Sequence, residues 1–185
     1  MRSTILICTL FLSSCCSFAQ SQAPAAAAKD PFRNESLVFD RSETTYRMRA
    51  DGTGERIVRT VMRVQSQGAA QKFGVLAVGY ASANETVHIT LVRVHKPDGT
   101  TVDTPSDTAI DMPAEVTREA PLYSDLKQKH LAVRSLSVGD TLEYEVHTTI
   151  DKPEAPGQFW GATHFVVPGT VVVLAEIVNL EVPKD

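Results

Sequence analysis

The chain has 185 residues, of which 43% are hydrophobic, and its 18 lysines and arginines stand against 22 aspartates and glutamates, for a formal net charge of −4. This length fits one domain with a core of its own. The acidic balance argues against a nucleic-acid-binding protein, because phosphate-binding modules present a strongly basic face.

Residues 1–19 have the pattern of a secretory signal peptide. Arg2 supplies a positive charge, the apolar run 5–12 is too short to span a bilayer, and Ser17 and Ala19 occupy the −3 and −1 positions of a signal-peptidase site. Cleavage after Ala19 predicts export to the periplasm or the extracellular medium. No later apolar run is long enough to cross a membrane, so no membrane span is expected.

All three cysteines, Cys8, Cys15 and Cys16, lie within this leader. Cleavage after Ala19 therefore leaves a mature chain without a thiol for a disulfide, a thiolate metal site or a cysteine nucleophile. The alternative is a lipoprotein signal, because Leu-Ser-Ser-Cys at 12–15 also has the small-small-Cys form used in bacterial lipidation, with a lipid anchor at Cys15. We favour cleavage after Ala19, since lipidation leaves Cys16 as an unexplained second thiol.

Residues 20–35 form a flexible linker rich in alanine, proline and glutamine. The folded domain is predicted over residues 36–185. Within it, turn signals are closely spaced and the segments between them are short and rich in residues that favour strands.

The first hairpin is predicted from segments 44–50 and 55–65, which flank the turn Asp51-Gly52-Thr53-Gly54. Asp-Gly between strand-forming runs is a strong hairpin signal. Side chains alternate between the two faces of a strand. The expected core face carries three residues from each strand: Tyr46, Met48 and Ala50, and Val58, Met62 and Val64.

A second hairpin is predicted from segments 86–95 and 100–104 around Pro97-Asp98-Gly99, where proline presets φ and glycine accepts the left-handed conformation. Residues 68–73 could form one or two helical turns.

The remaining strands come from the second half of the chain. Segments 131–133 and 141–150 are predicted to pair around the turn 138–140, and 170–182 is predicted as one long strand. Short strands, frequent turns and at most one short helix indicate an all-β fold, an antiparallel β-sandwich.

The last predicted strand leads to a further expectation. It is apolar, contains an uncharged run at 169–175, and lies a few residues from Asp185. Such a strand needs a neighbour, because an uncovered apolar edge is an aggregation site. We therefore expect the 36–185 domain to be truncated at its C-terminus and the chain to be marginally soluble or oligomeric.

Several of these segments together resemble one family, on the residues 47–71, 92–105, 112–146 and 155–160. It is the domain of unknown function found ahead of a transglutaminase-like domain in secreted bacterial proteins. The resemblance implies an extracytoplasmic β-sandwich with no assigned catalytic residues, placed before a papain-like core with a Cys-His-Asp triad. That triad cannot be carried onto this chain, since no cysteine follows Cys16.

Two groups of polar residues have the chemistry of a site. Ser124, Asp125 and His130 are the residue types of a hydrolase triad, but a Ser-Asp turn ahead of a strand explains them more simply. Alternation places Glu143, Glu145 and His147 on one strand face, where they could bind a divalent cation. A solvated strand face explains that alternation equally well. We therefore predict no catalytic residue, metal ion or cofactor.

A binding surface is the remaining candidate. Arginines at Arg47, Arg49, Arg59 and Arg63 face away from the expected core and could hold a polyanion, or could instead pair with acidic residues across the strands. The aromatic residues Tyr123, Phe159 and Trp160 complete this candidate surface, with core packing as the alternative for the tryptophan.

The sequence thus predicts a non-catalytic, exported β-sandwich that serves as a scaffold or interaction module, with a transglutaminase-like domain or another protein as its partner. The alternative is a fragment of a transglutaminase-like cysteine peptidase or acyltransferase, whose catalytic core lies outside these 185 residues. In either case the chain itself is not expected to be an enzyme.

Overall fold

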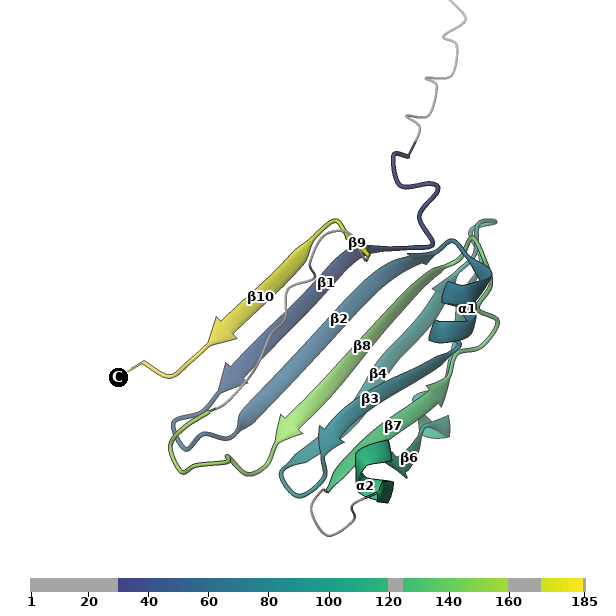
Figure 1. The fold of residues 1–185 in the computed structure, drawn as a ribbon. Coiled ribbons are helices and arrows are strands. Elements are labelled where there is room, and N and C mark those ends of the chain that lie inside the picture. The colour runs from purple at the N-terminus through teal and green to yellow at the C-terminus, as the bar shows by residue number, and fades with distance from the viewer. Residues whose placement is uncertain (1–29, 120–124, 160–170, 185) are drawn as a thin grey trace, which may run out of the picture. The chain divides into compact units, whose positions relative to one another are not determined.

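Two β-sheets make up most of the structure, a computed structural model that describes residues 30–119, 125–159 and 171–184 (Figure 1). The described strands belong to one compact unit, residues 31–185. The prediction of an all-β, largely antiparallel fold is confirmed.

The larger sheet has the strand order β10-β1-β2-β8-β4-β5, and a short strand, β9, also pairs with β1. Its strands are β1 (Leu37–Met48), β2 (Gly54–Val64), β4 (Glu85–His95), β5 (Thr101–Asp103), β8 (Thr141–Ile150), β9 (Val172–Val173) and β10 (Glu176–Glu181). Neighbours are antiparallel, except that β9 and β10 run parallel to β1.

The smaller sheet has the order β3-β7-β6, with β3 (Val75–Ala81), β6 (Ile110–Pro113) and β7 (Leu126–Ala132). Three short helical segments accompany it: α1 (Gln67–Phe73), the 3-10 turn η1 (Ser106–Thr108) and α2 (Glu115–Glu119). Figure 1 shows this sheet on the β4 side of the larger one, away from β10, β1 and β2. Among the described residues, no helix combines the length and apolarity needed to span a membrane.

The core lies between the face of the larger sheet that carries Met62, Leu142 and Val94, and the smaller sheet, which contributes Leu131. Each of these four side chains is fully buried. Burial of each such side chain stabilises the fold by roughly 1.5–3 kcal/mol relative to leaving it exposed. We call this core-side surface the inner face of the larger sheet.

Helix α1 closes one end of this core. Its first turn is capped by Ser66, whose side-chain oxygen accepts a hydrogen bond from the backbone N–H of Ala69 at 3.1 Å. Ala69 and Ala70 are buried, and the ring of Phe73 meets that of Phe39 edge to face at 6.2 Å between centroids.

Both predicted hairpins are confirmed, as β1–β2 and β4–β5, and so is the short helix at α1. Gly52 and Gly99 have φ of 88° and 86°, as their turns require. The predicted core residues are only partly right. Met48, Met62 and Val64 are buried and Tyr46 and Val58 are half-buried, but Ala50 is exposed because β1 ends at Met48.

The predicted pairing of 131–133 with 141–150 is wrong. Strand β7 lies in the smaller sheet between β3 and β6, whereas β8 pairs with β2 and β4. The turn before β8 is nevertheless present, with Gly139 at a φ of 94°. It connects two sheets instead of two strands of one hairpin.

The predicted single strand over 170–182 is also wrong. Val172–Val173 and Glu176–Glu181 form two strands, β9 and β10, separated by Leu174 and Ala175, and Thr170 lies outside the described residues. The described part of the chain also contains the helix α2, Glu115–Glu119, in addition to α1, which is one helix more than predicted.

Candidate functional site

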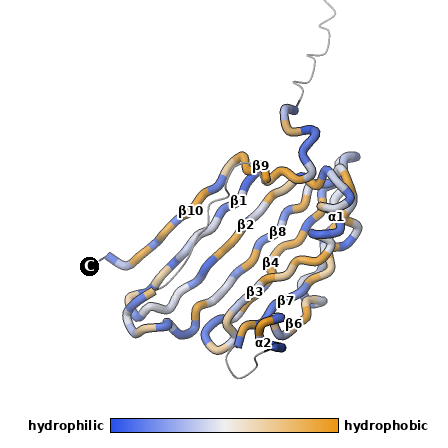
Figure 2. The backbone as a smooth tube through the Cα atoms, in the orientation of Figure 1, coloured by the Kyte–Doolittle hydropathy of each residue, from blue (hydrophilic) through white to orange (hydrophobic). Residues whose placement is uncertain are grey.

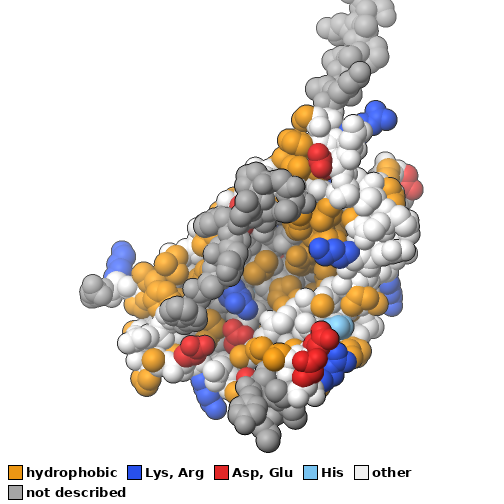
Figure 3. All heavy atoms as spheres, in the orientation of Figure 1, with side chains coloured by type: hydrophobic (Ala, Val, Ile, Leu, Met, Phe, Trp, Pro, Cys, Tyr) orange, Lys and Arg blue, Asp and Glu red, His pale blue; other side chains and the backbone are white. Residues whose placement is uncertain are grey.

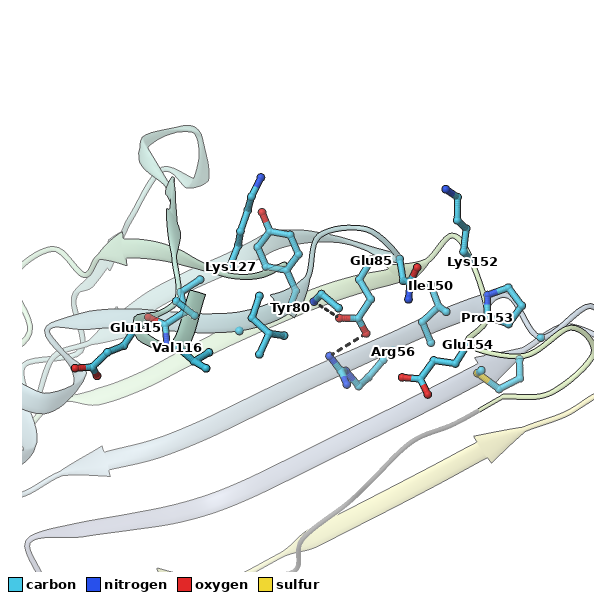
Figure 4. Close-up of a pocket in the computed structure, with 18 residues that line it drawn as sticks. Arg56, Tyr80, Glu85, Glu115, Val116, Lys127, Ile150, Lys152, Pro153 and Glu154 are labelled. Atoms are coloured by element: carbon cyan, nitrogen blue, oxygen red, sulfur yellow. Dashed lines mark hydrogen bonds and ion pairs between the residues drawn. The ribbon is translucent and has the colours of Figure 1, made fainter. Parts of the chain in front are cut away.

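A cleft of about 590 Å³ opens at one end of the two sheets (Figure 4). The larger sheet contributes the N-terminal part of β2 and the end of β8, and the smaller sheet contributes the facing ends of β3 and β7. Helix α2 and the segment 152–154 complete its walls. Clefts that bind small ligands typically have volumes of about 300–1,000 Å³.

An arginine and a glutamate face each other within the cleft. The register of β2 against β1 and β8 pairs Arg56 with Tyr46 and Thr148, which puts Arg56 on the inner face. Its Nη2 lies 3.8 Å from Oε1 of Glu85, at the start of β4 (Figure 4). The two side chains are 28% and 19% exposed.

The glutamate is held by a second contact. Its Oε2 accepts a hydrogen bond from the backbone N–H of Ala81 at 3.0 Å, which ties the start of β4 to the end of β3. The carboxylate is therefore fixed by the β3–β4 turn, while the guanidinium reaches it from the larger sheet. A charged pair this far from solvent requires good partners to offset the loss of hydration.

Both apolar and charged side chains surround this pair. Met48 is buried beside it, whereas Val116 and Leu126 reach into the cleft with 48% and 41% of their surface exposed. Lys127 and Lys152 extend from the walls, and Glu154 lies on the same side as Arg56 (Figure 4).

Tyr80 also lines the cleft, but its hydroxyl is engaged elsewhere. It donates to Oδ1 of Asp111 at 2.9 Å, and Lys129 contacts the same carboxylate at 3.0 Å. Burial, and then the hydrogen bond to Asp111, raises the pKa of Tyr80 to about 12. Tyr80 is consequently a neutral hydrogen-bond donor near neutral pH and not a phenolate base.

The opposite, outer face of the larger sheet carries a network of ion pairs. Arg59 Nη2 lies 2.6 Å from Glu143 Oε1, and His95 Nε2 lies 3.1 Å from the other oxygen of that carboxylate. The hydrogen bond from Arg59 lowers the pKa of Glu143, with a smaller opposing effect of burial. Glu145 contacts His147 at 2.9 Å.

Glu143, Glu145 and His147 thus lie on the outer face as members of ion pairs, with 13%, 27% and 36% of their side chains exposed. In the part of the chain that the structure describes, no group of histidine, cysteine, aspartate and glutamate side chains is arranged to hold a metal ion.

The four predicted arginines are distributed along the first hairpin, and each has a partner. Arg47 pairs with Glu55 and Glu181 at 3.0 and 3.1 Å, and Arg59 with Glu143. Arg63 pairs with Asp40 at 2.9 Å, and Arg49 donates to Thr53 Oγ1 at 3.1 Å. Three of the four are thus ion-paired to acidic neighbours, which agrees with the cross-strand alternative to a polyanion site.

The predicted aromatic residues are not brought together in the described structure. Phe159 is 46% exposed, and Tyr123 and Trp160 lie outside the described residues. Ser124 lies outside them too, while Asp125 accepts a hydrogen bond from the backbone N–H of Ala83 at 2.7 Å and His130 contacts Gln128. Asp125 therefore supports the β3–β4 turn.

The sequence analysis missed Arg56 and Glu85. The signal was nevertheless present, because Arg56 has the strand parity of Val58, Met62 and Val64. A charged residue at a core-facing position is unusual unless it is paired. The core-facing position of Arg56 on its strand therefore indicated a polar site between the two sheets.

Comparison with known proteins identifies a family and a fold. Residues 50–185 match the family described as "Domain of Unknown Function with solved-structure structure (DUF3857)". A crystal structure from Parabacteroides distasonis, described as a "putative protease", aligns with a TM-score of 0.58 and 19% identity. The alignment covers 63% of this chain and 23% of that one, so this chain spans less than a quarter of that relative.

A second solved structure resembles the chain less. It is the CBM3a-L domain of a scaffoldin from the Clostridium thermocellum cellulosome, with 9% identity over 71% of this chain and 80% of that one. Its TM-score of 0.38 is too low to indicate a shared fold. No curated protein sequence matches the chain.

Proposed function

The chain belongs to the DUF3857 family, and from that premise we propose that it is a non-catalytic, exported domain that packs against a catalytic domain of the transglutaminase-like or peptidase type. The partner domain lies in the same polypeptide or in a second one. The observation that carries the proposal is a pair of exposed apolar side chains, Val178 and Leu180, on the inner face of the edge strand β10.

This exposed region lies beyond the smaller sheet. On β10, Val178 pairs with Thr44 and Leu180 with Tyr46, so both point to the inner face. They are 39% and 57% exposed. Figure 3 shows hydrophobic side chains gathered on this side of the molecule, and Figure 2 places apolar residues along β10.

Val178 and Leu180 lie two residues apart on one face of β10, so a protein that covers one of them can cover both. Such a surface on an edge strand is also a liability unless a partner occupies it. A neighbouring domain that rests on β10 and β1 would bury Val178 and Leu180 and protect that edge.

The size relationship supports a partner domain. The Parabacteroides relative shares the fold over 23% of its length and is described as a "putative protease". In a protein of that kind, most of the chain is available for a separate catalytic domain. The signal-peptide pattern of residues 1–19 supports export of the assembly.

Labelling of single introduced cysteines would test the proposed contact. With Cys8, Cys15 and Cys16 replaced by serine, the sequence has no other thiol, so Val178→Cys or Leu180→Cys would report on this surface alone. We expect both cysteines to react with a maleimide at least tenfold more slowly when the transglutaminase-like polypeptide from the same genome is present, fused or added.

Arg59→Cys is the matched control, since its side chain is 51% exposed on the outer face. Its labelling rate should not change. Equal labelling of all three cysteines with and without the partner would contradict the proposed contact. Hydrolysis of a peptide or ester by the chain alone would contradict its non-catalytic role.

A further inference from the structure

We propose that the cleft binds a carboxylate ligand that also carries an apolar group, and that Arg56 receives the carboxylate. This inference concerns a different part of the inner face from the exposed patch on β10. It therefore stands or falls independently of the proposed domain contact.

Arg56 carries more hydrogen-bonding capacity than its surroundings use. A guanidinium has five N–H donors in a fixed fork that fits a carboxylate. Among the described residues its charged partner is Glu85 at 3.8 Å, which is too long for a hydrogen bond. Nearly three quarters of the Arg56 side chain is removed from solvent, since only 28% is exposed. Among the described residues no buried side-chain nitrogen lacks a hydrogen-bond partner, so the N–H groups of Arg56 that Glu85 does not engage are open to the solvent of the cleft, where a ligand carboxylate can accept from them.

Glu85 holds the Arg56 guanidinium in place but does not occupy all of its N–H donors. The carboxylate accepts from the backbone N–H of Ala81 through Oε2 and lies 3.8 Å from Arg56 Nη2 through Oε1. The arginine is thereby kept in the cleft with its fork open to a second carboxylate.

The walls beside Arg56 suit an apolar group. Val116 and Leu126 line the cleft and are 48% and 41% exposed, and Met48 and Ile150 lie on the larger-sheet side. Covering such surface is favourable in proportion to the apolar area removed from water. A ligand with an aliphatic side chain next to its carboxylate can contact these walls while it pairs with Arg56.

The charges of the cleft favour a single negative charge on the ligand. Three cationic and three anionic side chains line it: Arg56, Lys127 and Lys152, and Glu85, Glu115 and Glu154. Because these charges balance, a phosphate or another polyanion gains little from the overall field and is repelled by the nearby glutamates. A monocarboxylate needs only the local guanidinium.

The test is a ¹⁵N NMR titration of the whole chain with ligands that differ in one group. The probes are N-acetyl-leucine and its amide, acetyl-Ala-Ala-Leu and its amide, and inorganic phosphate. We expect the acids to bind with millimolar Kd, at least tenfold more tightly than the amides, and to shift the amide signals of Ala81, Asn84 and Val116. Phosphate should cause no saturable shift at these residues.

Variants assign the effect to Arg56. Arg56→Gln should remove the preference for acid over amide, whereas Arg59→Gln, on the same strand but on the outer face, should retain it. If Arg56→Gln fails to fold, Val116→Glu keeps the arginine and places a negative charge at an exposed wall position. This variant should weaken acid binding at least tenfold.

The outcomes separate the sources of the ligand. Tighter binding of the tripeptide acid than of N-acetyl-leucine assigns the site to a peptide C-terminus, and equal binding assigns it to a small carboxylic acid. Equal binding of acids and amides, saturable binding of phosphate, or an unchanged acid preference in Arg56→Gln or Val116→Glu would overturn the proposal.

Discussion

Individual charged residues in this protein differ in how much they contribute, because their burial differs. Arg41 and Glu43 form an exposed pair at 2.7 Å, whereas Lys96 and Asp140 form a pair of the same length with only 21% and 2% of their side chains exposed. Exposed pairs contribute about 0–1 kcal/mol, but removal of one partner of a buried pair is strongly destabilising.

Asp140→Ala is the first prediction. Besides Lys96, the carboxylate of Asp140 accepts a hydrogen bond from the backbone N–H of Ser137 at 2.7 Å, so it fixes the turn before β8. We expect Asp140→Ala to lower the free energy of unfolding by about 3 kcal/mol. Asp140→Asn, which retains an acceptor, should lower it by about 1–2 kcal/mol.

Urea unfolding at pH 7 measures both changes. Arg41→Gln, which disrupts only the exposed pair, is the control and should change stability by less than about 1 kcal/mol. A loss that small for Asp140→Ala would show that the buried pair does not stabilise the turn.

Glu143 gives a prediction about pH. Its pKa in the folded protein lies below the ordinary value of 4.5, chiefly because Arg59 donates a hydrogen bond to it. The ionised carboxylate therefore stabilises the fold above about pH 4.5, and this contribution disappears as the pH falls through the folded-state pKa. Glu143→Gln should be less stable than the wild type by roughly 1 kcal/mol at pH 7.

That difference should shrink steadily as the pH falls below about 4.5, which urea unfolding over a series of pH values can follow. Glu119→Gln, on the exposed helix α2, is the matched control for the Glu→Gln change and should alter stability at pH 7 by no more than about 0.5 kcal/mol. A Glu143→Gln difference that is constant with pH would contradict the assigned cause.

At the scale of elements, two turns whose glycines have nearly the same positive φ, Gly52 and Gly99, have different surroundings. A Cβ on Gly52 would clash with the carbonyl oxygen of Gln158 and would lie 2.8 Å from Cβ of Pro153. A Cβ on Gly99 would meet no atom within 4 Å. The first turn is thus packed against the segment after β8, and the second projects freely.

Alanine substitution at these turns gives the third prediction. Gly99→Ala should destabilise the protein by about 1–2 kcal/mol, which is the effect of a left-handed conformation alone. Gly52→Ala adds a steric clash with backbone and should cost at least about 1 kcal/mol more. Thermal and urea unfolding of the two variants compare their stabilities directly. Equal losses of unfolding free energy would mean that the segment 153–158 moves away from the added methyl group at no cost.

These elements also show which parts of the fold the sequence determines locally. The β1–β2 and β4–β5 hairpins were predictable because the turn residues and the alternation of each lie in one short continuous stretch of chain. The pairing of β7 with β3 joins Leu131 to Leu76, 55 positions apart, and no local pattern encodes it. The cleft was difficult to predict for the same reason. The sequence shows that Arg56 faces the core, but its ion pair with Glu85 forms only because β8 lies between β2 and β4 in the sheet.

For the whole molecule, the exposed apolar side of β10 predicts self-association in the absence of a partner. We expect the chain to form oligomers at micromolar concentration, and the double variant Val178→Lys/Leu180→Lys to be monomeric, because charged residues protect sheet edges. Light scattering coupled to size exclusion measures both. Val75→Lys, 46% exposed on the smaller sheet, is the matched control.

This control should leave the oligomers in place. A wild-type chain that is monomeric at all concentrations would show that the β10 surface does not drive association.

The parallel pairing of β10 with β1 has a mechanical consequence. Because the two strands run in the same direction, the start of β1 at Leu37 and the end of β10 at Glu181 lie at opposite ends of the sheet (Figure 1). Tension applied between these two points loads the ladder from Ser42–Glu176 to Arg47–Glu181 in shear, so that its hydrogen bonds must fail together. An antiparallel pair pulled from adjacent ends would instead unzip one bond at a time. A domain connected in this way can transmit force between neighbours attached at its two ends while remaining folded.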